Sequence, residues 1–255
     1  MATWIAHLRV AEALFAALPH LDETAFMYGN LAPDSGKPNA DWTAFDPPKE
    51  VTHFLRRGEG EDKIHDLKFY RAYLADRQPD EDVADTSFRL GYFFHLICDN
   101  LWSRRLTTTY KRLYPDLIDN PTHPLWTAFK RDWYHLDFCY LRDHPTCLFW
   151  RVYMTTPNPP TYMPFVSADG LTYSLDHIRT FYSTPNPERN IDRAYIYLNE
   201  TTMNRYVEDS VQAILKLYKR LQLRPALDGL NSAVNLLDED DLTPYEPPLG
   251  DAAAI

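Results

Sequence analysis

Residues 88–102, FRLGYFFHLICDNLW, carry large apolar side chains at helical spacing on almost every side. A helix over 84–105 would therefore be buried most of the way round. His95 and Asp99 are four residues apart in it, so their Cβ atoms would lie about 5–6 Å from each other on one face. Because a buried carboxylate needs a strong partner, the elements that pack around this helix must supply one.

Gly91 lies one turn before His95 on the same face. It costs a helix roughly 1 kcal/mol relative to alanine, which predicts a neighbour that must approach closely. That neighbour could be a metal ion held by His95 and Asp99. The alternative, which this helix taken alone favours, is a neutral core histidine hydrogen-bonded to a buried aspartate. Further candidate ligands are needed to decide between them.

The composition predicts a globular protein of one domain. The chain has 255 residues, which fits one domain with loops and a tail. No apolar run approaches the ~18 residues of a membrane span, so we expect no transmembrane segment. His7, Arg9 and Glu12 interrupt the start of the chain, where a secretory signal would have an unbroken apolar core. We therefore expect a cytoplasmic protein.

The net charge of −10 argues against a broad phosphate-binding surface. Proteins that bind extended nucleic acids usually carry a basic stripe, and the sequence contains none. Bound divalent ions would reverse the sign locally, which leaves room for a single phosphate group. The sequence makes no prediction about oligomeric state.

Apolar residues at helical period predict further helices around the buried one. These helices are expected over 3–18, 62–76, 107–118, 124–141 and 202–221. Alternation of apolar and polar residues over five or more positions is nearly absent. The predicted fold class is therefore all-α, a single-domain multi-helix bundle over residues 1–225 built around the buried helix.

Three segments are predicted to be irregular. Residues 28–38 are dense in turn-forming residues and predict a loop. Residues 147–199 are rich in proline and tyrosine and predict a long excursion around a short helix near 174–182. Residues 226–255 contain the acidic run 238–241 and predict a poorly ordered tail.

Imidazole and carboxylate groups on two helices and two loops form a candidate metal-ligand set. The members are His7, Asp34, His53, His95 and Asp99. Imidazole and carboxylate without thiolate suit zinc or another borderline divalent ion in a site with open positions. Such sites are typical of hydrolytic rather than structural metal centres.

Four segments resemble the zinc-dependent phospholipase C domain family, which is related to bacterial phospholipase C enzymes and fungal zinc nucleases. They are the amino-terminal helix with His7, the loop 29–34 (GNLAPD), the segment 51–54 (VTHF) and the stretch 91–99 (GYFFHLICD). Their order and spacing carry the resemblance, which covers about the first 105 residues. The second half resembles the family only as a set of helices.

The resemblance implies an all-α domain that binds zinc. Two or three zinc ions are expected, and one is the minimum. Asp34, His53, His95 and Asp99 would bind one zinc. Asp99 would bridge to another zinc, which also uses His7 and the free amine and carbonyl of the first residue of the processed chain. Removal of Met1 would make Ala2 that residue, five positions before His7.

The chain departs from the family pattern where another histidine and a His-x-x-x-Glu or His-x-x-x-Asp pair would hold the remaining zinc. Here His135 is followed four residues later by Cys139. Asp132, His135 and Cys139 share one helix side and could supply this zinc in altered form. Asp137 could do so from the other edge, or the third site could be absent.

The function that follows from the resemblance is a zinc-dependent phosphodiester hydrolase, similar to phospholipase C, that acts on a small phosphodiester or a phospholipid headgroup bond. Asp34 is the expected catalytic base, accepting the proton of the attacking water. One alternative is a single-strand nuclease or another phosphoesterase of the same superfamily, and the acidic charge disfavours the nuclease. The other is a non-catalytic helical protein that keeps one residual zinc as a structural clip.

Overall fold

The structure is a computed structural model that describes residues 1–41, 43–58, 63–77, 82–117, 120, 123–223 and 225–251. The fold is all-α, as predicted: 61% of the chain is helical. The helices of the described residues are α1 Trp4–Ala17, α2 Glu23–Leu31, α3 Lys49–Thr52, α4 Asp66–Tyr73, α5 Val83–Trp102, α6 Thr108–Leu113, α7 Pro124–Asp143, α8 Ala168–Ser183, α9 Glu200–Gln222 and α10 Glu239–Leu242. The strands β1 (Lys37–Pro38) and β2 (Phe45–Asp46) form a small antiparallel ladder. None of the described helices is long and apolar enough to cross a membrane.

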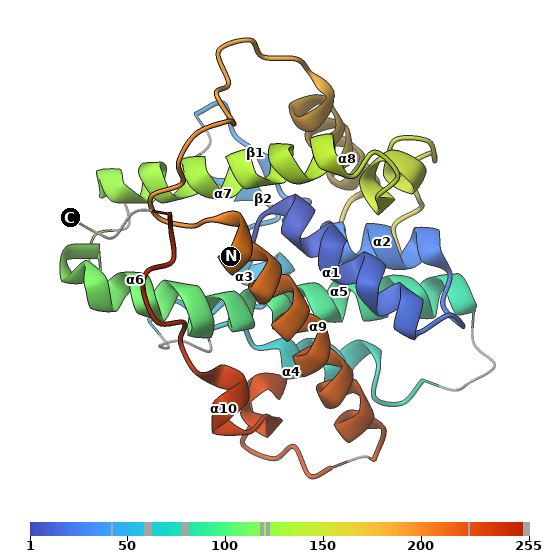
Figure 1. The fold of residues 1–255 in the computed structure, drawn as a ribbon. Coiled ribbons are helices and arrows are strands. Elements are labelled where there is room, and N and C mark those ends of the chain that lie inside the picture. Colours follow the sequence, from blue (N-terminus) through green and yellow to red (C-terminus); the bar gives the residue numbers. More distant parts are fainter. Residues whose placement is uncertain are drawn as a thin grey trace.

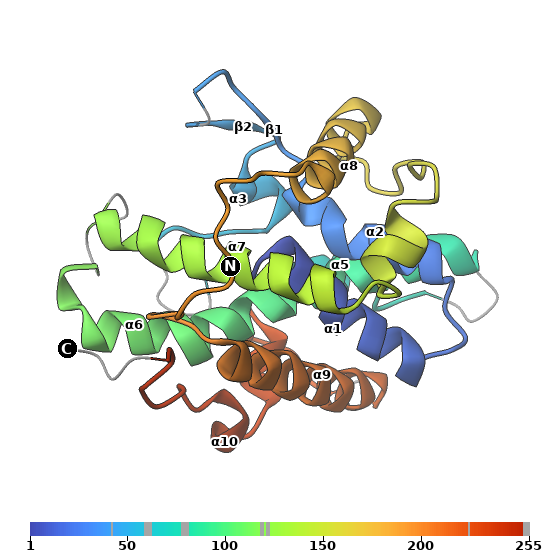
Figure 2. The ribbon, with the colours of Figure 1, turned by 45° about the horizontal axis from the view of Figure 1, so that its top comes forward.

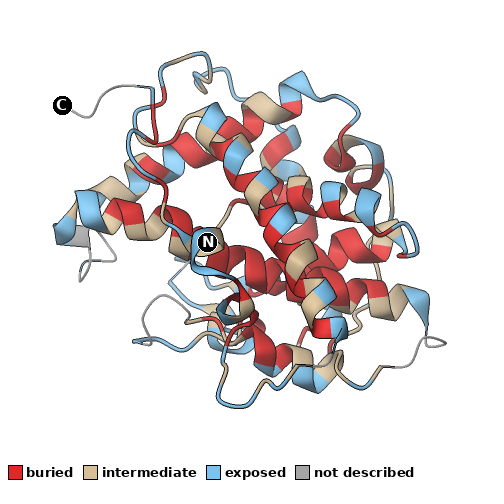
Figure 3. Ribbon diagram, turned by 60° about the horizontal axis from the view of Figure 1, so that its bottom comes forward, coloured by how far each residue is buried: buried red, intermediate tan, exposed pale blue. Residues whose placement is uncertain are grey.

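Helix α5 lies at the centre of the molecule, with α1, α2, α4 and α9 packed around it (Figure 1). Every residue from Ser87 to Trp102 except Arg89 is buried, and Figure 3 shows this burial concentrated where the helices meet. The Asp82 side chain caps the start of α5 by accepting from the backbone amides of Ala84 and Asp85. The predicted buried helix is therefore confirmed, and it continues into a π-helical turn, Ser103–Thr107.

Two glycines bring α2 and α5 into backbone contact. A Cβ atom at Gly29 would lie 1.9 Å from the carbonyl oxygen of Phe88, and one at Gly91 would lie 2.1 Å from that of Phe26. Gly91 therefore makes room for a helix, not directly for an ion. The sequence predicted a loop over 28–38, but 28–31 form the last turn of α2. Turn-forming residues are helical here because the close helix crossing requires a residue without a side chain.

The proline- and tyrosine-rich segment contains more helix than the sequence predicted. Helix α8 covers Ala168–Ser183, where a short helix near 174–182 was expected, and Phe149–Tyr153 form a π-helical turn. The Ser167 hydroxyl caps α8 by accepting from the amide of Gly170. The Ser174 hydroxyl then donates to the carbonyl oxygen of Asp34 at 3.1 Å, which fixes α8 beside the loop that carries Asp34.

Residues 225–251 pack on the helical domain, which differs from the predicted poorly ordered tail. The carboxylate of Asp66 accepts from the amide of Ala233 at 2.7 Å and from Asn100 Nδ2 at 2.9 Å. Val234 and Leu249 are buried. The prediction was based on the acidic run 238–241 and overlooked the apolar residues on either side of it. Burial of those apolar side chains holds the segment against the helices. Residues 252–255 of the predicted tail lie outside the described residues.

Candidate metal centre

His95 projects from the middle of α5 and is oriented by α2. Its Nδ1 lies 2.8 Å from the backbone carbonyl oxygen of Asn30, so Nδ1 carries the proton and donates it. This leaves the lone pair of Nε2 directed away from the carbonyl. A second hydrogen bond of this kind is how proteins fix the tautomer of a metal-binding histidine.

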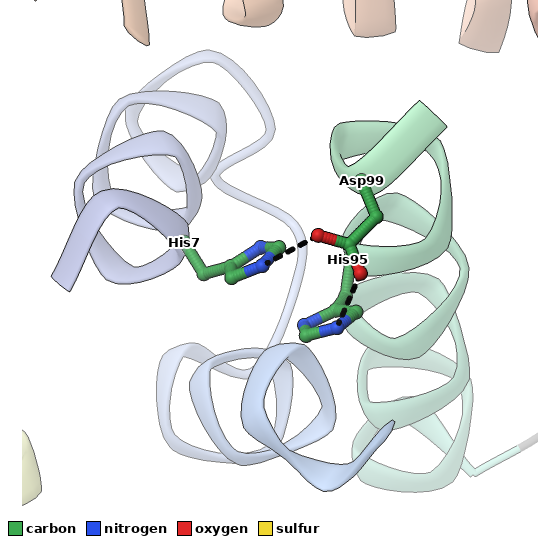
Figure 4. A group of neighbouring side chains, drawn as sticks. All are labelled: His7, His95 and Asp99. Atoms are coloured by element: carbon green, nitrogen blue, oxygen red, sulfur yellow. Dashed lines mark ion pairs between the residues drawn. The ribbon is translucent and has the colours of Figure 1, made fainter. Parts of the chain in front are cut away.

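Asp99 lies one turn after His95 and is fully buried. Its Oδ1 is 3.3 Å from His7 Nε2, and its Oδ2 is 3.6 Å from His95 Nε2 and 3.7 Å from His53 Nε2. Figure 4 shows the carboxylate between the imidazoles of His7 on α1 and His95 on α5. The amide of Ala2 donates to Asp99 Oδ1 at 2.9 Å. The position from which the resemblance implies a terminal amine therefore lies beside Asp99, and removal of Met1 stays a prediction.

His7 is buried without a hydrogen-bond partner. Its ring is stacked on that of His95 at a centroid distance of 3.8 Å. Among the described residues, neither ring nitrogen of His7 nor Oδ2 of Asp99 has a hydrogen-bond partner. Buried polar atoms are nearly always paired, and each one left unpaired costs roughly 1–3 kcal/mol. A cation held by His7 Nε2 and the Asp99 carboxylate would give partners to one nitrogen of His7 and to Asp99, whereas Nδ1 of His7 points elsewhere.

Asp34 and His53 approach the same place from outside α5. Asp34 ends the 3-10 turn Ala32–Asp34, and His53 directly follows α3. His53 Nε2 lies 3.4 Å from Asp34 Oδ1 and 3.3 Å from His95 Nε2. On its other side, His53 Nδ1 lies 3.0 Å from the Thr52 hydroxyl, so the Nε2 atoms of both histidines face each other and the carboxylates.

The distances within this cluster fit ligands of an ion better than direct hydrogen bonds. The nitrogen–oxygen separations run from 3.3 to 3.7 Å, longer than normal hydrogen bonds. Two atoms that each lie about 2.1 Å from a tetrahedral zinc are about 3.4 Å apart. Within the described residues, two groups place their ligand atoms within 4.8 Å of one another: His7 with His95 and Asp99, and Asp34 with His53 and His95. Both groups share His95, whose Nε2 can bind one ion, so the geometry shows one candidate metal cluster, and a second ion would need Asp99 as a bridge.

The electrostatics favour a neutral His7 and an ionised Asp99, the forms that can bind a metal, but they favour the protonated form of His95. Burial lowers the pKa of His7 to about 4, so its imidazole is neutral at pH 7. Burial alone would raise the pKa of Asp99, but the neighbouring imidazoles of His7 and His95 outweigh it and hold that pKa well below its usual range. Because Asp99 is ionised, the neighbouring His95 has a raised pKa despite its own burial.

Asp34 is the least buried member of the cluster, with 16% of its side chain exposed. Trp4 Nε1 donates to Asp34 Oδ2 at 3.0 Å, and Lys49 Nζ lies 3.8 Å from Asp34 Oδ1. The neighbouring imidazole of His53 and the charge of Lys49 lower the pKa of Asp34, although burial opposes this. Nothing in the sequence indicated these roles: Trp4 belongs to an apolar stripe, and Lys49 lies next to two prolines.

Asp132 and His135 lie beside Arg193 and not beside the other candidate ligands. Asp132 accepts from Arg193 Nη2 at 2.7 Å and from the amide of Tyr197 at 2.8 Å. Arg193 Nη2 also lies 3.4 Å from His135 Nδ1. A guanidinium neutralises this carboxylate, and neither residue belongs to a group of converging ligand atoms within the described part of the chain, so binding of a third zinc by Asp132 and His135 stays a prediction. Cys139 is likewise engaged elsewhere, with Sγ 3.2 Å from the Tyr195 hydroxyl.

Asp137 contacts the segment that leads into the helix bearing His7 and is not itself part of the cluster. Its carboxylate accepts from the Thr3 hydroxyl at 2.7 Å and from the Tyr182 hydroxyl at 2.5 Å. Thr3 in turn caps α1 by accepting from the amide of Ala6. Asp137 therefore holds the start of the helix that presents His7, a positioning role in place of the ligand role considered from the sequence.

Asp137 should give the protein a measurable pH dependence. Burial raises the pKa of this carboxyl from 3.8 to about 7. Between these values the folded protein holds a proton that the unfolded chain has released, so the free energy of unfolding falls as pH rises. Relative to Asp137→Asn, we expect the wild type to lose up to about 4 kcal/mol between about pH 4 and pH 8 in urea unfolding. A difference between the two proteins that does not change with pH would contradict this.

A cavity of about 460 Å³ lies beside Asp34. Residues 1–4, Asp34, Lys49 and Thr52 line it next to the candidate ligands, and residues of α7, α8 and the segment 33–47, together with Lys63 and Thr107, line the rest. Figure 2 shows the N-terminus close to α3, α7 and α8, the elements that contribute these residues. The cavity is therefore continuous with the exposed edge of the metal centre.

Comparison with known proteins identifies no relative. No family model, no curated protein and no solved structure matches the chain. The function of the site must therefore be argued from its residues and geometry.

Proposed function

We propose that this chain is a zinc-dependent phosphodiester hydrolase similar to phospholipase C. The observation that carries the proposal is the convergence of His7, Asp34, His53, His95 and Asp99 from separate segments, at nitrogen–oxygen separations of 3.3 to 3.7 Å. Imidazoles and carboxylates without thiolate favour zinc with open coordination positions. Buried nitrogen atoms of His7 that lack partners among the described residues support a site built for cations.

The protein supplies positioning and a base for this reaction. Zinc held by His7, Asp34, His53, His95 and Asp99 would supply charge that neutralises phosphate oxygens and would lower the pKa of water towards about 7. Asp34 lies at the boundary between the cluster and the cavity, where it can take a proton from the attacking water. Trp4 and Lys49 hold its two carboxylate oxygens, which fixes the direction of its lone pairs. The cavity receives the group beyond the scissile phosphate.

Metal content and turnover test the proposal together. The purified protein is analysed for bound metals, then assayed with bis(p-nitrophenyl) phosphate, short-chain phosphatidylcholine and single-stranded DNA, with and without a chelator. We expect two zinc ions per chain and diester hydrolysis that the chelator abolishes and zinc restores. One tightly held ion without turnover would favour the structural clip, and preferential cleavage of DNA would favour the nuclease. A protein that binds no metal would overturn all three readings.

Asp34→Asn separates the base from the ligands. The amide keeps the shape of the side chain and one oxygen for the metal, but it cannot accept a proton at neutral pH. We expect diester turnover to fall about 100-fold while zinc remains bound. Rate measurements paired with metal analysis check this. Unchanged turnover would remove Asp34 from the mechanism, and a matching loss of zinc would make it a ligand only.

A further inference from the structure

The two oxygens of the Asp34 carboxylate face different neighbours. Oδ1 lies 3.4 Å from His53 Nε2 and therefore points towards the candidate metal ligands. Oδ2 accepts a hydrogen bond from Trp4 Nε1 at 3.0 Å, the shortest polar contact to this carboxylate among the described residues. Lys49 Nζ also approaches Oδ1, but only to 3.8 Å. The Trp4 indole is therefore the neighbour that makes the two oxygens unequal.

Aromatic side chains of α7 and α8 hold the Trp4 indole in this direction. Four rings have their centroids between 5.8 and 6.1 Å from that of Trp4, namely Tyr134, His177, Phe181 and Tyr182. Three of them meet it nearly edge-on, at interplanar angles of 80° to 88°, an arrangement in which aromatic rings attract each other. Because a ring packed against these neighbours cannot turn freely, its N–H stays directed at Asp34.

The backbone of Trp4 is fixed as well. Trp4 is the first residue of α1, and Thr3 caps this helix. The Thr3 hydroxyl donates to Asp137 Oδ1, while Asp137 Oδ2 accepts from the hydroxyl of Tyr182, one of the rings packed on Trp4. His7 follows Trp4 by three residues on the same helix. One turn of α1 therefore carries a candidate ligand and the hydrogen-bond donor to another.

Other indoles of the cavity wall show what a purely structural tryptophan does. Half-buried or buried tryptophan N–H groups usually find an acceptor. Trp126 Nε1 donates to the carbonyl oxygen of Asn120, and Trp133 Nε1 donates to the hydroxyl of Tyr110, both at 3.2 Å. Neither acceptor is a candidate ligand, whereas the acceptor of Trp4 is one.

We propose that Trp4 is a positioning residue for Asp34, whose indole N–H holds Oδ2 and leaves Oδ1 to face the metal centre. A carboxylate can bind a cation through one oxygen or through both, and hydrogen bonds from the surrounding groups decide how a ligand is presented. The inference rests on the metal centre of the proposed function. It adds to that centre a residue that is not itself a ligand.

Two changes at Trp4 remove the N–H. Trp4→Phe keeps an aromatic ring in the wall, and incorporation of an analogue with benzothiophene in place of indole also keeps the shape. We expect the affinity for zinc, measured by competition with a chromophoric chelator, to fall about tenfold in both. The visible absorption of the cobalt-substituted protein should change, because it reports the coordination geometry of the ion. With the benzothiophene analogue, kcat for diester hydrolysis should fall about tenfold at unchanged KM.

Trp126→Phe is the matched control. Trp126 is half-buried like Trp4 and lines the same cavity, but its indole donates to a backbone carbonyl. Its zinc affinity and cobalt spectrum should equal those of the wild type. Unchanged affinity and spectrum in both Trp4 variants, or the same change in Trp126→Phe, would overturn the inference. A purely structural role would lower the urea midpoint of Trp4→Phe and leave both metal measurements unchanged.

The metal measurements separate this inference from the proposed function. A wild type that binds zinc without turnover would reject the enzyme, and the zinc affinities and cobalt spectra of the variants would still decide the role of Trp4. Turnover in the wild type together with unaltered Trp4 variants would reject the inference alone. A wild type that binds no metal would overturn both.

Discussion

Asp99→Asn should abolish metal binding and diester hydrolysis together. Asp99 is the residue around which the site is built, since both of its oxygens face imidazole nitrogens of three different segments. Substitution of groups that only support a ligand already costs about 10–100-fold in metal affinity, so loss of a shared carboxylate should cost at least about 100-fold. We expect turnover to fall by about 1,000-fold or more, the equivalent of about 4 kcal/mol of transition-state stabilisation. Metal analysis and steady-state kinetics measure the two effects.

The thermal stability of Asp99→Asn gives a second, independent measurement. Ions that bind only the folded protein stabilise it by about 2.7 kcal/mol at a free concentration one hundred times their Kd. Chelation should therefore lower the melting temperature of the wild type and leave that of the variant unchanged. A variant that still responds to the chelator would show that Asp99 is not a ligand.

Asp132→Asn is the matched control for a buried carboxylate. Asp132 is as buried as Asp99, but its partners are Arg193 and the amide of Tyr197. Its substitution should destabilise the fold because Arg193 loses its counter-ion, yet the amount of bound metal should stay the same. If this variant loses zinc, the third site considered from the sequence exists after all.

Gly91→Ala should unfold or strongly destabilise the protein. The new methyl group would lie 2.1 Å from the carbonyl oxygen of Phe26 and 2.8 Å from the amide of Asn30. Both atoms belong to the backbone of α2, so relief requires the two helices to separate. We expect the free energy of unfolding to fall by about 3 kcal/mol or more, well beyond the roughly 1 kcal/mol that alanine adds to helix propensity. Denaturant unfolding measures this loss.

The same substitution should weaken metal binding, because His95 is oriented by the carbonyl oxygen of Asn30 on α2. Gly58→Ala is the control. A Cβ atom at Gly58 meets nothing within 4 Å, and its φ of 85° is the only obstacle. It should cost about 1–2 kcal/mol and leave bound zinc unchanged. A Gly91→Ala protein as stable as Gly58→Ala would contradict the close crossing of α2 and α5.

Much of the helical framework follows from local sequence. The apolar stripes predicted for 3–18, 124–141 and 202–221 correspond to α1, α7 and α9 within a few residues. Periodicity suffices there because the pattern repeats over several turns and one face meets the core. The predictions differ from the structure where one residue type is compatible with two kinds of local structure. Gly29 and Asn30 indicated a turn, yet the same lack of a side chain at Gly29 is what permits α2 to touch α5.

The candidate site, too, could be predicted from the sequence only in part. By itself the sequence determined the helical class and the pairing of His95 with Asp99, because residues four apart on a helix must share a face. Tertiary structure alone decided that His7, Asp34 and His53 meet this pair, that Arg193 engages Asp132, and that lysines from distant segments line one cavity. Those facts depend on contacts between residues far apart in the chain, and local periodicity carries no information about such contacts.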